Sequence, residues 1–210
     1  MGGAVFKKGL FIYNDYKEQD YLENLGKIKG SRFIVNNEYP EKRTVELLKK
    51  NCIEVYFKVN LSGNWCEDLK HAKDRGFDYV AIDGENYSKM VVYSLELGQG
   101  VRECIEKLGF KGCILLPEDL GGDKYKDYNE FIKGLMPDEV LMERTYLTWK
   151  PWEFIKFIKR NTWYSKPYIG IWPEEMCPVF RWLQEFFVKL ISGDRIFWYA
   201  ETKTAPRIKR

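Results

Sequence analysis

The sequence has little histidine, no close cysteine pair and no long apolar run, and each absence excludes a class of protein. The one histidine, His71, and five cysteines without a C-x-x-C motif leave no zinc-site spacing, and we expect no disulfide framework either. The net charge is only +3 and both signs are mixed along the chain, so no nucleic-acid partner is expected. No apolar run reaches membrane-spanning length and the N-terminus lacks the apolar core of a signal peptide, which predicts a cytoplasmic protein without a membrane partner.

What is present is the composition of a globular domain. Hydrophobic residues make up 45% of the 210 residues and charged residues 31%, enough for a sizeable core and a solvated surface. No repeat, low-complexity tract or linker interrupts the chain, so a single domain over residues 1–210 is predicted. Abundant Lys and Glu with few Gln is a composition typical of proteins from thermophiles.

Short apolar runs alternate with amphipathic stretches along the chain. The apolar runs predict strands over residues 10–13, 32–36, 54–59, 79–83, 112–116, 139–142, 168–171 and 195–199. Apolar residues at three- and four-residue spacing predict helices over residues 41–51, 65–76, 94–109, 125–135, 151–161 and 178–193. This alternation is typical of a compact (β/α)8 barrel of the TIM type. The rival, a doubly wound open sheet, lacks the G-x-G-x-x-G turn after the first strand.

The ends of the predicted elements carry their own signals. Gly76, Gly109, Gly134 and Gly193 stand at predicted helix ends, where glycine suits a left-handed C-cap. Few residues follow the last predicted strand, so we expect the last helix of the barrel to be short or absent.

Carboxylates gather at the predicted strand exits, where a barrel of this kind builds its active site. Every exit carries one except the third, where Asn60 stands. The acidic residues at the exits are Asp15, Glu38, Asp83 with Glu85, Glu118, Glu143, Glu174 with Glu175, and Glu201. Acids also favour helix N-termini, which these loops precede, so helix stabilisation explains part of the excess.

Aromatic residues mark the same ends of the strands. Trp172 and Trp198 fall in or just beyond the last two strands, and Tyr146 follows the sixth. Flat rings beside carboxylates suit sugars, because the C–H faces of a sugar stack on aromatic rings while its hydroxyls need acceptors. Core packing is the alternative for these rings, and Trp182, within a predicted helix, is expected to be structural.

The fourth predicted strand carries the most informative pattern, Phe-Asp-Tyr-Val-Ala-Ile-Asp-Gly-Glu over residues 77–85. The alternation of side chains along a strand puts Ala81, Asp83 and Glu85 on one face, with Asp83 pointing into the barrel mouth. Two carboxylates so placed disfavour each other's charged forms, so one of them can stay protonated and act as a general acid.

This segment resembles the strand motif of the family 18 glycoside hydrolases, the chitinase-like enzymes, whose usual form is FDGhDhDWE with h apolar. The matching residues are Phe77, Asp78, Val80, Ile82, Asp83 and Glu85. The resemblance implies that Glu85 protonates the glycosidic oxygen and that Asp83 orients the N-acetyl group of the substrate, which is the nucleophile in that family. It also implies that Tyr146 contacts the acetamido group and that Trp198 forms the floor of the sugar subsite.

Two residues depart from the motif, Ala81 at the middle aspartate and Gly84 at the aromatic. The loss of the aspartate removes a proton partner of Asp83 and should impair the usual cycle. We therefore predict a glycoside hydrolase-like barrel that cleaves a sugar polymer with Glu85 as general acid/base. The alternative is a catalytically inactive barrel that binds carbohydrate or a protein partner.

The remaining expectations concern ligands and mechanism. Carbohydrate is the predicted partner, and its binding residues would be Asp15, Glu143, Trp172, Glu174, Trp198 and Glu201. An ordinary retaining mechanism would instead pair Glu85 with Glu143 or Glu174 as nucleophile. No cofactor is predicted, although carboxylates alone could hold Mg²⁺ or Ca²⁺, which need only oxygen ligands. A phosphate-handling barrel is disfavoured, because neither of the last two strand exits has a glycine-rich turn.

Overall fold

The fold is taken from a computed structural model, which describes residues 9–13, 33–36, 40–51, 54–61, 63–84, 91–116, 125–142, 168–171 and 196–201, together with residues 179, 182, 183 and 186. For the first and the last two strands the description covers the backbone alone. In chain order the elements are β1 (Gly9–Tyr13), β2 (Phe33–Asn36), α3 (Lys42–Asn51), β3 (Glu54–Asn60), α4 (Trp65–Asp74), β4 (Tyr79–Asp83), α5 (Leu95–Lys107), β5 (Gly112–Leu116), α6 (Tyr125–Leu135), β6 (Glu139–Met142), β7 (Tyr168–Ile171) and β8 (Ile196–Glu201).

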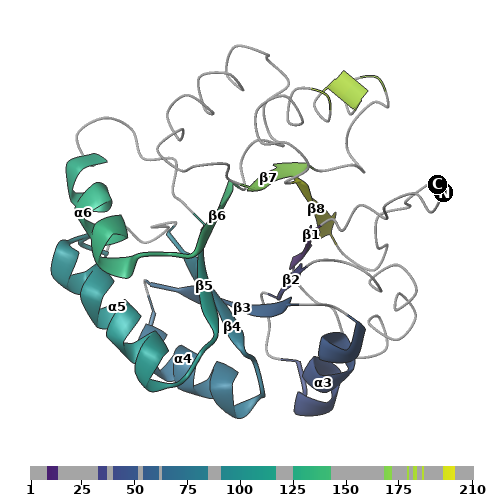
Figure 1. The fold of residues 1–210 in the computed structure, drawn as a ribbon, viewed down its shortest axis with the longest axis horizontal. Helices are drawn as coiled ribbons and strands as arrows, with labels where there is room; N and C mark the ends of the chain where they lie inside the picture. Colours follow the sequence, from purple (N-terminus) through teal and green to yellow (C-terminus); the bar gives the residue numbers. More distant parts are fainter. Residues whose placement is uncertain are drawn as a thin grey trace.

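The strands close into a barrel. Each strand pairs in parallel with the next along the chain, and β8 pairs in parallel with β1 (Figure 1). Helices α3 to α6 lie outside the ring of strands. The predicted barrel is thus confirmed: β4 to β7 have the predicted bounds, and the other strands differ from them by one or two residues at an end. The extent of the domain over the whole chain stays a prediction, and the segment after β8 lies outside the described residues.

The helix ends confirm two of the glycine predictions and correct a third. Gly76 and Gly109 follow α4 and α5 with φ of +89° and +70°, the left-handed conformation that glycine adopts without steric cost. Gly134 lies inside α6, and the left-handed residue after that helix is Met136, with φ of 47°. Gly193 and the helix predicted over residues 151–161 lie outside the described part of the chain.

The correction at Gly134 has a physical reason in the packing of α5 against α6. A Cβ on Gly134 would lie 2.8 Å from the amide nitrogen of Gln99, and a Cβ on Gly98 would lie 2.8 Å from that of Leu135. Real Cβ atoms essentially never come so close to a backbone atom. The two glycines therefore let the helix backbones touch, which is a packing role rather than a capping role.

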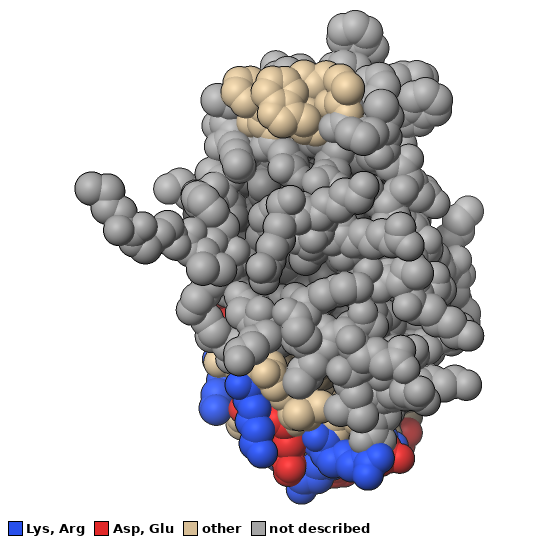
Figure 2. Space-filling model, turned by 90° about the vertical axis from the view of Figure 1, so that its right-hand side faces the viewer, with Lys and Arg blue, Asp and Glu red and all other residues tan. Residues whose placement is uncertain are grey.

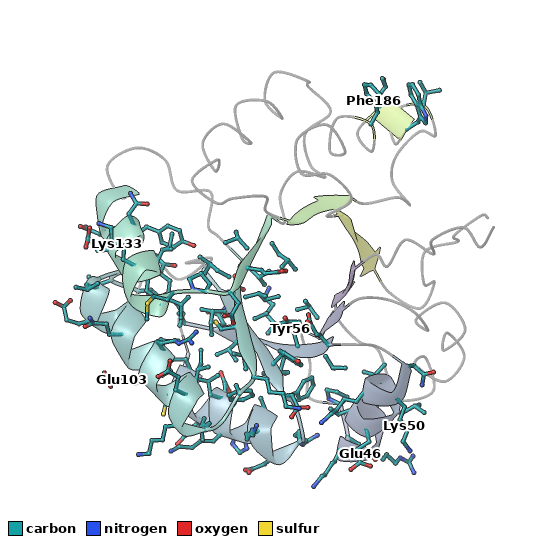
Figure 3. The ribbon with its side chains drawn as sticks, viewed as in Figure 1. Glu46, Lys50, Tyr56, Glu103, Lys133 and Phe186 are labelled. Atoms are coloured by element: carbon teal, nitrogen blue, oxygen red, sulfur yellow. The ribbon has the colours of Figure 1, made fainter. Side chains whose placement is uncertain are left out.

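Strands β3 and β4 have two different faces. The outward face is apolar: Phe57, Val59, Val80 and Ile82 belong to a buried cluster that includes residues of α3 to α6, such as Phe131. The alternate residues face the inside of the barrel. There the ring of Tyr56, labelled in Figure 3, meets the ring of Tyr79 from the neighbouring strand, with centroids 5.0 Å apart.

The surface of the described part is uneven. Lys, Arg, Asp and Glu mix at the end where α3 lies, whereas an apolar patch stands at the opposite end (Figure 2). The exposed apolar side chains there are Val179, Trp182 and Phe186, and the rings of Trp182 and Phe186 stack with centroids 5.8 Å apart. The expectation that Trp182 has a structural packing role is wrong, because 63% of its surface is exposed.

Candidate functional site

On the inner face of the barrel, β3 and β4 hold a buried pair of oppositely charged side chains. The Nζ atom of Lys58 lies 2.9 Å from Oδ2 of Asp83, and their side chains are only 6% and 1% exposed. Asp83 is the last residue of β4, so the pair lies toward the carboxyl ends of the strands, where barrel enzymes have their active sites. Strand register explains the pairing, because Lys58 stands opposite Ala81, and Asp83 opposite Asn60.

The small side chain of Ala81 is what leaves this contact open. Residues Lys58 and Ala81 are direct neighbours on the inner face, and Asp83 follows two residues later on the same face. A long lysine side chain can pass the methyl group of Ala81 and reach the carboxylate diagonally across the strand pair. The residue that departs from the glycosidase motif therefore has a structural role in the ion pair.

Lys58 is the functional candidate that the sequence argument missed. The signal was visible, because a lysine interrupts the apolar run Val-Tyr-Phe-Lys-Val of residues 55–59. Strands of a parallel barrel are covered on both faces, so a charged residue in the middle of one must be buried. A buried charge is costly unless it is paired, and it therefore points to a partner and to a site.

The structure adds a cation to the expected surroundings of Asp83. We expected Glu85 as its electrostatic neighbour, two positions along the same strand face. Glu85 lies outside the described residues, and the ion pair that the structure describes joins the buried Oδ2 of Asp83 to the ammonium of Lys58 on β3. Asp83 is thus a member of an ion pair across two strands, and the expected pairing with Glu85 stays a prediction.

Gly84 continues the site one residue beyond β4. The amide nitrogen of Gly84 donates a hydrogen bond to the carbonyl oxygen of Leu116, at 2.7 Å, and the carbonyl oxygen of Gly84 accepts one from the hydroxyl of Tyr93. A Cβ at this position would lie 2.8 Å from the Leu116 oxygen and would also collide with the hydroxyl of Tyr128. Only glycine fits here, so an aromatic residue of the glycosidase motif has no room.

Tyr93 and Tyr128 form the wall behind this turn. Their rings meet edge to face with centroids 4.8 Å apart, and each also packs against Phe131 of α6. Both tyrosines are buried. The path of the chain directly after Asp83 is thus fixed by hydrogen bonds and aromatic packing, which holds the carboxylate in place.

A second set of polar groups lies near the start of β3. The hydroxyl of Tyr56 donates a hydrogen bond to Oε2 of Glu54, at 3.0 Å. Burial raises the pKa of the Tyr56 phenol well above its usual value, and the negative charges of Glu54 and Glu139 add to the effect. The phenol therefore stays protonated and neutral, which suits a packed end of the barrel rather than a reacting group.

The other predicted site residues are placed as follows. Asp15, Glu85, Glu143, Tyr146, Trp172 and Glu174 lie outside the described residues. Trp198 and Glu201 belong to β8, where Trp198 stands opposite Leu10 and Glu201 opposite Tyr13 of β1. Their side chains are not described, so their part in a site stays a prediction.

Two further findings bear on ligands and location. Within the described ranges, no group of three or more His, Cys, Asp or Glu side chains gathers in a way that could hold a metal ion. Among the helices that the structure describes, none is long and apolar enough to cross a membrane. His71 lies exposed on α4, within the helix predicted over residues 65–76.

Comparison with known proteins gives the fold but no family. No family model matches the chain, and no curated protein matches it by sequence. Among solved structures, it is similar to 3-keto-L-gulonate-6-phosphate decarboxylase from Vibrio cholerae, with a TM-score of 0.60 and 11% identity over 95% of this chain and 91% of that one. KGPDC from Streptococcus mutans gives a TM-score of 0.55 and 12% identity over the same shares. A putative phosphonomutase from Burkholderia cenocepacia gives 0.52 and 9%, over 93% of this chain and 89% of that one.

These findings overturn the glycoside hydrolase hypothesis. The similar barrels are decarboxylases and a phosphonomutase, and they are not family 18 glycoside hydrolases. The resemblance rested on nine residues, and the described structure accounts for three of them in another way. Ala81 makes room for Lys58, Asp83 pairs with that lysine, and Gly84 fits a turn closed to side chains. Sugar-polymer cleavage and carbohydrate binding are therefore withdrawn, together with the acid/base role of Glu85 that they required.

Proposed function

We propose that this chain is a lyase of the decarboxylase type, which removes a carboxyl group from a small 3-oxo acid. The observation that carries the proposal is the buried ion pair of Lys58 and Asp83 at the carboxyl ends of β3 and β4. In the proposed reaction, Lys58 is the catalytic cation and proton donor. Asp83 is the positioning residue that keeps it charged and directed.

The chemistry follows from what a 3-oxo acid needs when it loses carbon dioxide. The bond between the carboxyl carbon and its neighbour breaks, and its electron pair moves onto the ketone oxygen to give an enolate. A buried ammonium beside that oxygen stabilises the developing negative charge, and it does so strongly where water is excluded. Lys58 then donates a proton to the carbon that lost the carboxyl group, and solvent returns a proton to the amine.

The ion pair favours this role over covalent catalysis. A lysine that forms a Schiff base must be a neutral amine, and enzymes obtain it by burial without a counter-ion or beside another cation. Lys58 has the carboxylate of Asp83 at 2.9 Å as its partner, which is neither of those two settings. A charged lysine can donate a proton and stabilise an anion, but it cannot attack a carbonyl.

The similar structures support the same class of reaction. The Vibrio cholerae protein is by its name a decarboxylase of a phosphorylated 3-keto sugar acid, and that barrel covers nearly all of this chain. At 11% identity this likeness concerns the fold, so the residues of this chain carry the argument. We accordingly expect a small oxo acid as substrate, with phosphorylated sugar acids among the first compounds to test.

The test is release of carbon dioxide from a panel of 3-oxo acids, with and without a phosphate group. We expect turnover of at least one compound by the wild type. Lys58→Arg should lower kcat by about 10²–10⁴-fold, because the guanidinium keeps the charge beside Asp83 but does not give up its proton. Lys133→Arg, on the exposed face of α6, is the matched control and should leave kcat unchanged.

Two outcomes contradict the proposal. In the first, no compound of the panel releases carbon dioxide with the wild type. In the second, Lys58→Arg turns over as fast as the wild type and gives product with the same incorporation of solvent deuterium. Circular dichroism and the Tm of Lys58→Arg show separately that the variant is folded.

A further inference from the structure

Two cysteines from neighbouring helices lie in direct contact on the outside of the barrel. The sulfur of Cys66, in the first turn of α4, lies 3.6 Å from the sulfur of Cys104 in α5, with hydrogen-bond geometry between them. Both residues are half-buried and both are free thiols. They are 38 positions apart in the sequence, so no short sequence motif indicated their contact.

The packing of the two helices holds the thiols together. On α4, Leu69 is buried against the barrel, and Cys66 lies one turn before it on the same side. On α5, Val101 and Ile105 are buried, and Cys104 packs partly against the same apolar cluster. The two sulfurs are therefore fixed by the core beneath them, and they remain accessible at its edge.

We propose that Cys66 and Cys104 form an oxidisable dithiol site, which hydroperoxides convert to an intramolecular disulfide. A disulfide has a sulfur–sulfur distance of about 2.05 Å, so the sulfurs must approach by about 1.5 Å, which rotation of the two side chains supplies. The two thiols lie on helices outside the ring of strands, and the proposal does not depend on the proposed decarboxylase activity.

The reaction balances with the hydroperoxide as the oxidant. The sulfur of one cysteine attacks the peroxide, its O–O bond breaks, and a sulfenic acid and one molecule of water or alcohol result. The sulfur of the second cysteine attacks the sulfenic sulfur, and a second water leaves. Altogether two thiols give up two protons and two electrons, and the peroxide accepts them.

The surroundings of the two thiols decide the order of these steps. Burial, and then the hydrogen bond with Cys66, raise the pKa of the Cys104 thiol to about 11. Cys104 is therefore a poor first nucleophile at neutral pH, because the thiolate is the reactive form. Cys66 should form the sulfenic acid, and Cys104 should close the disulfide.

The disulfide would constrain the segment that carries Asp83. The loop between Cys66 and Cys104 contains α4, β4 and most of α5. Closing a loop of this length restricts the unfolded chain, and we expect the Tm to rise by about 5–10 °C. Reduction should reverse the change.

The experiment is oxidation of the full chain by hydrogen peroxide, followed by mass analysis. In the wild type, the number of free thiols should fall from five to three. The intact mass should fall by about 2 Da, the mass of the two hydrogens lost from the thiols. Proteolysis without reductant should give one new linked species, which joins the peptides of Cys66 and Cys104.

The variants assign the linkage. The double variant Cys52→Ser/Cys177→Ser keeps Cys66, Cys104 and the fully buried Cys113, and it should still lose about 2 Da. Cys104→Ser should instead gain about 16 Da, because the sulfenic acid on Cys66 finds no partner. The proposal is wrong if the wild type only gains oxygen, if the linked peptides contain another cysteine, or if Cys104→Ser still shows the mass loss of the wild type.

Discussion

The two faces of β3 and β4 meet different physical demands within the same few residues. The outer face, represented by Phe57 and Ile82, is buried in an apolar cluster with the helices. The inner face places Lys58 and Asp83 in an equally dry environment as an ion pair. Burial of the outer face stabilises the fold through apolar area, about 25 cal/mol for each Å² removed from water. Burial of the inner pair carries a desolvation cost that its mutual attraction only offsets.

The difference between the apolar outer face and the charged inner face indicates which residues serve function rather than stability. A barrel could be filled on the inside with branched apolar side chains, as most are. A buried lysine and aspartate are weak evidence for stability and stronger evidence for a site. Selective substitutions on each face can test whether the two really differ.

The largest effect is expected from removing one partner of the inner pair. Lys58→Met leaves the carboxylate of Asp83 buried without its cation, and it should lower the free energy of unfolding by about 3–5 kcal/mol. The measurement is urea denaturation at neutral pH. The double variant Lys58→Met/Asp83→Leu should recover most of the loss, because it leaves no unpaired charge. A loss below about 1 kcal/mol in the single variant would show that water reaches the pair and that the interior is not dry.

A smaller effect is expected where the outer layer is most tightly packed. Gly98→Ala places a Cβ against the backbone of α6, and it should lower the free energy of unfolding by about 1–3 kcal/mol through overpacking. Gly100→Ala, two residues along the same helix, meets nothing within 4 Å and should raise it by up to about 1 kcal/mol through helix propensity. Thermal or urea unfolding of both variants provides the comparison. Equal effects of the two substitutions would contradict the close contact of the helices.

The smallest effect is expected from a neutral group of the inner face. Tyr56→Phe removes the hydroxyl that donates to Glu54, and it should lower the free energy of unfolding by about 0.5–1.5 kcal/mol. Glu54 is only half-buried and can accept a hydrogen bond from water instead. Urea denaturation beside Lys58→Met measures the ratio of the two losses. If Tyr56→Phe lowered the free energy of unfolding as much as Lys58→Met, the charges of Lys58 and Asp83 would not explain the larger effect expected at that pair.

The sequence predicted the barrel because its signal is repeated along the chain. Each strand is a short apolar run and each helix a periodic one, and β4 to β7 were placed at their observed bounds. The capping role predicted for Gly134 was wrong, although α6 has the predicted bounds, because a glycine that ends a helix and a glycine that packs against another helix look alike in one sequence. Their difference depends on residues such as Gln99, which come from another element.

The site was predicted less well, for a related reason. The position of Asp83 at the end of β4 followed from alternation, and the structure places it there. Its partner did not follow, because Lys58 lies 25 residues earlier and reaches Asp83 only through the register of two strands. The nine-residue resemblance to glycosidases described the strand pattern, which any inward-facing carboxylate on a barrel strand would share. Contacts between elements, such as that of Cys66 with Cys104, stand outside what spacing along one segment can reveal.

The ion pair also has a consequence for how the barrel assembles. In a strand, a slip of one residue exchanges the two faces. If β3 paired with β4 one residue out of register, Lys58 would turn toward the apolar cluster beside Phe77 and Leu69, and Asp83 would lose its counter-ion. That mispaired state would bury two separate charges, each at a cost of several kcal/mol. The ion pair thus destabilises the wrong β3–β4 register far more than it stabilises the right one. Lys58 and Asp83, which we assign to the chemistry, therefore also help the chain to adopt a single register while it folds.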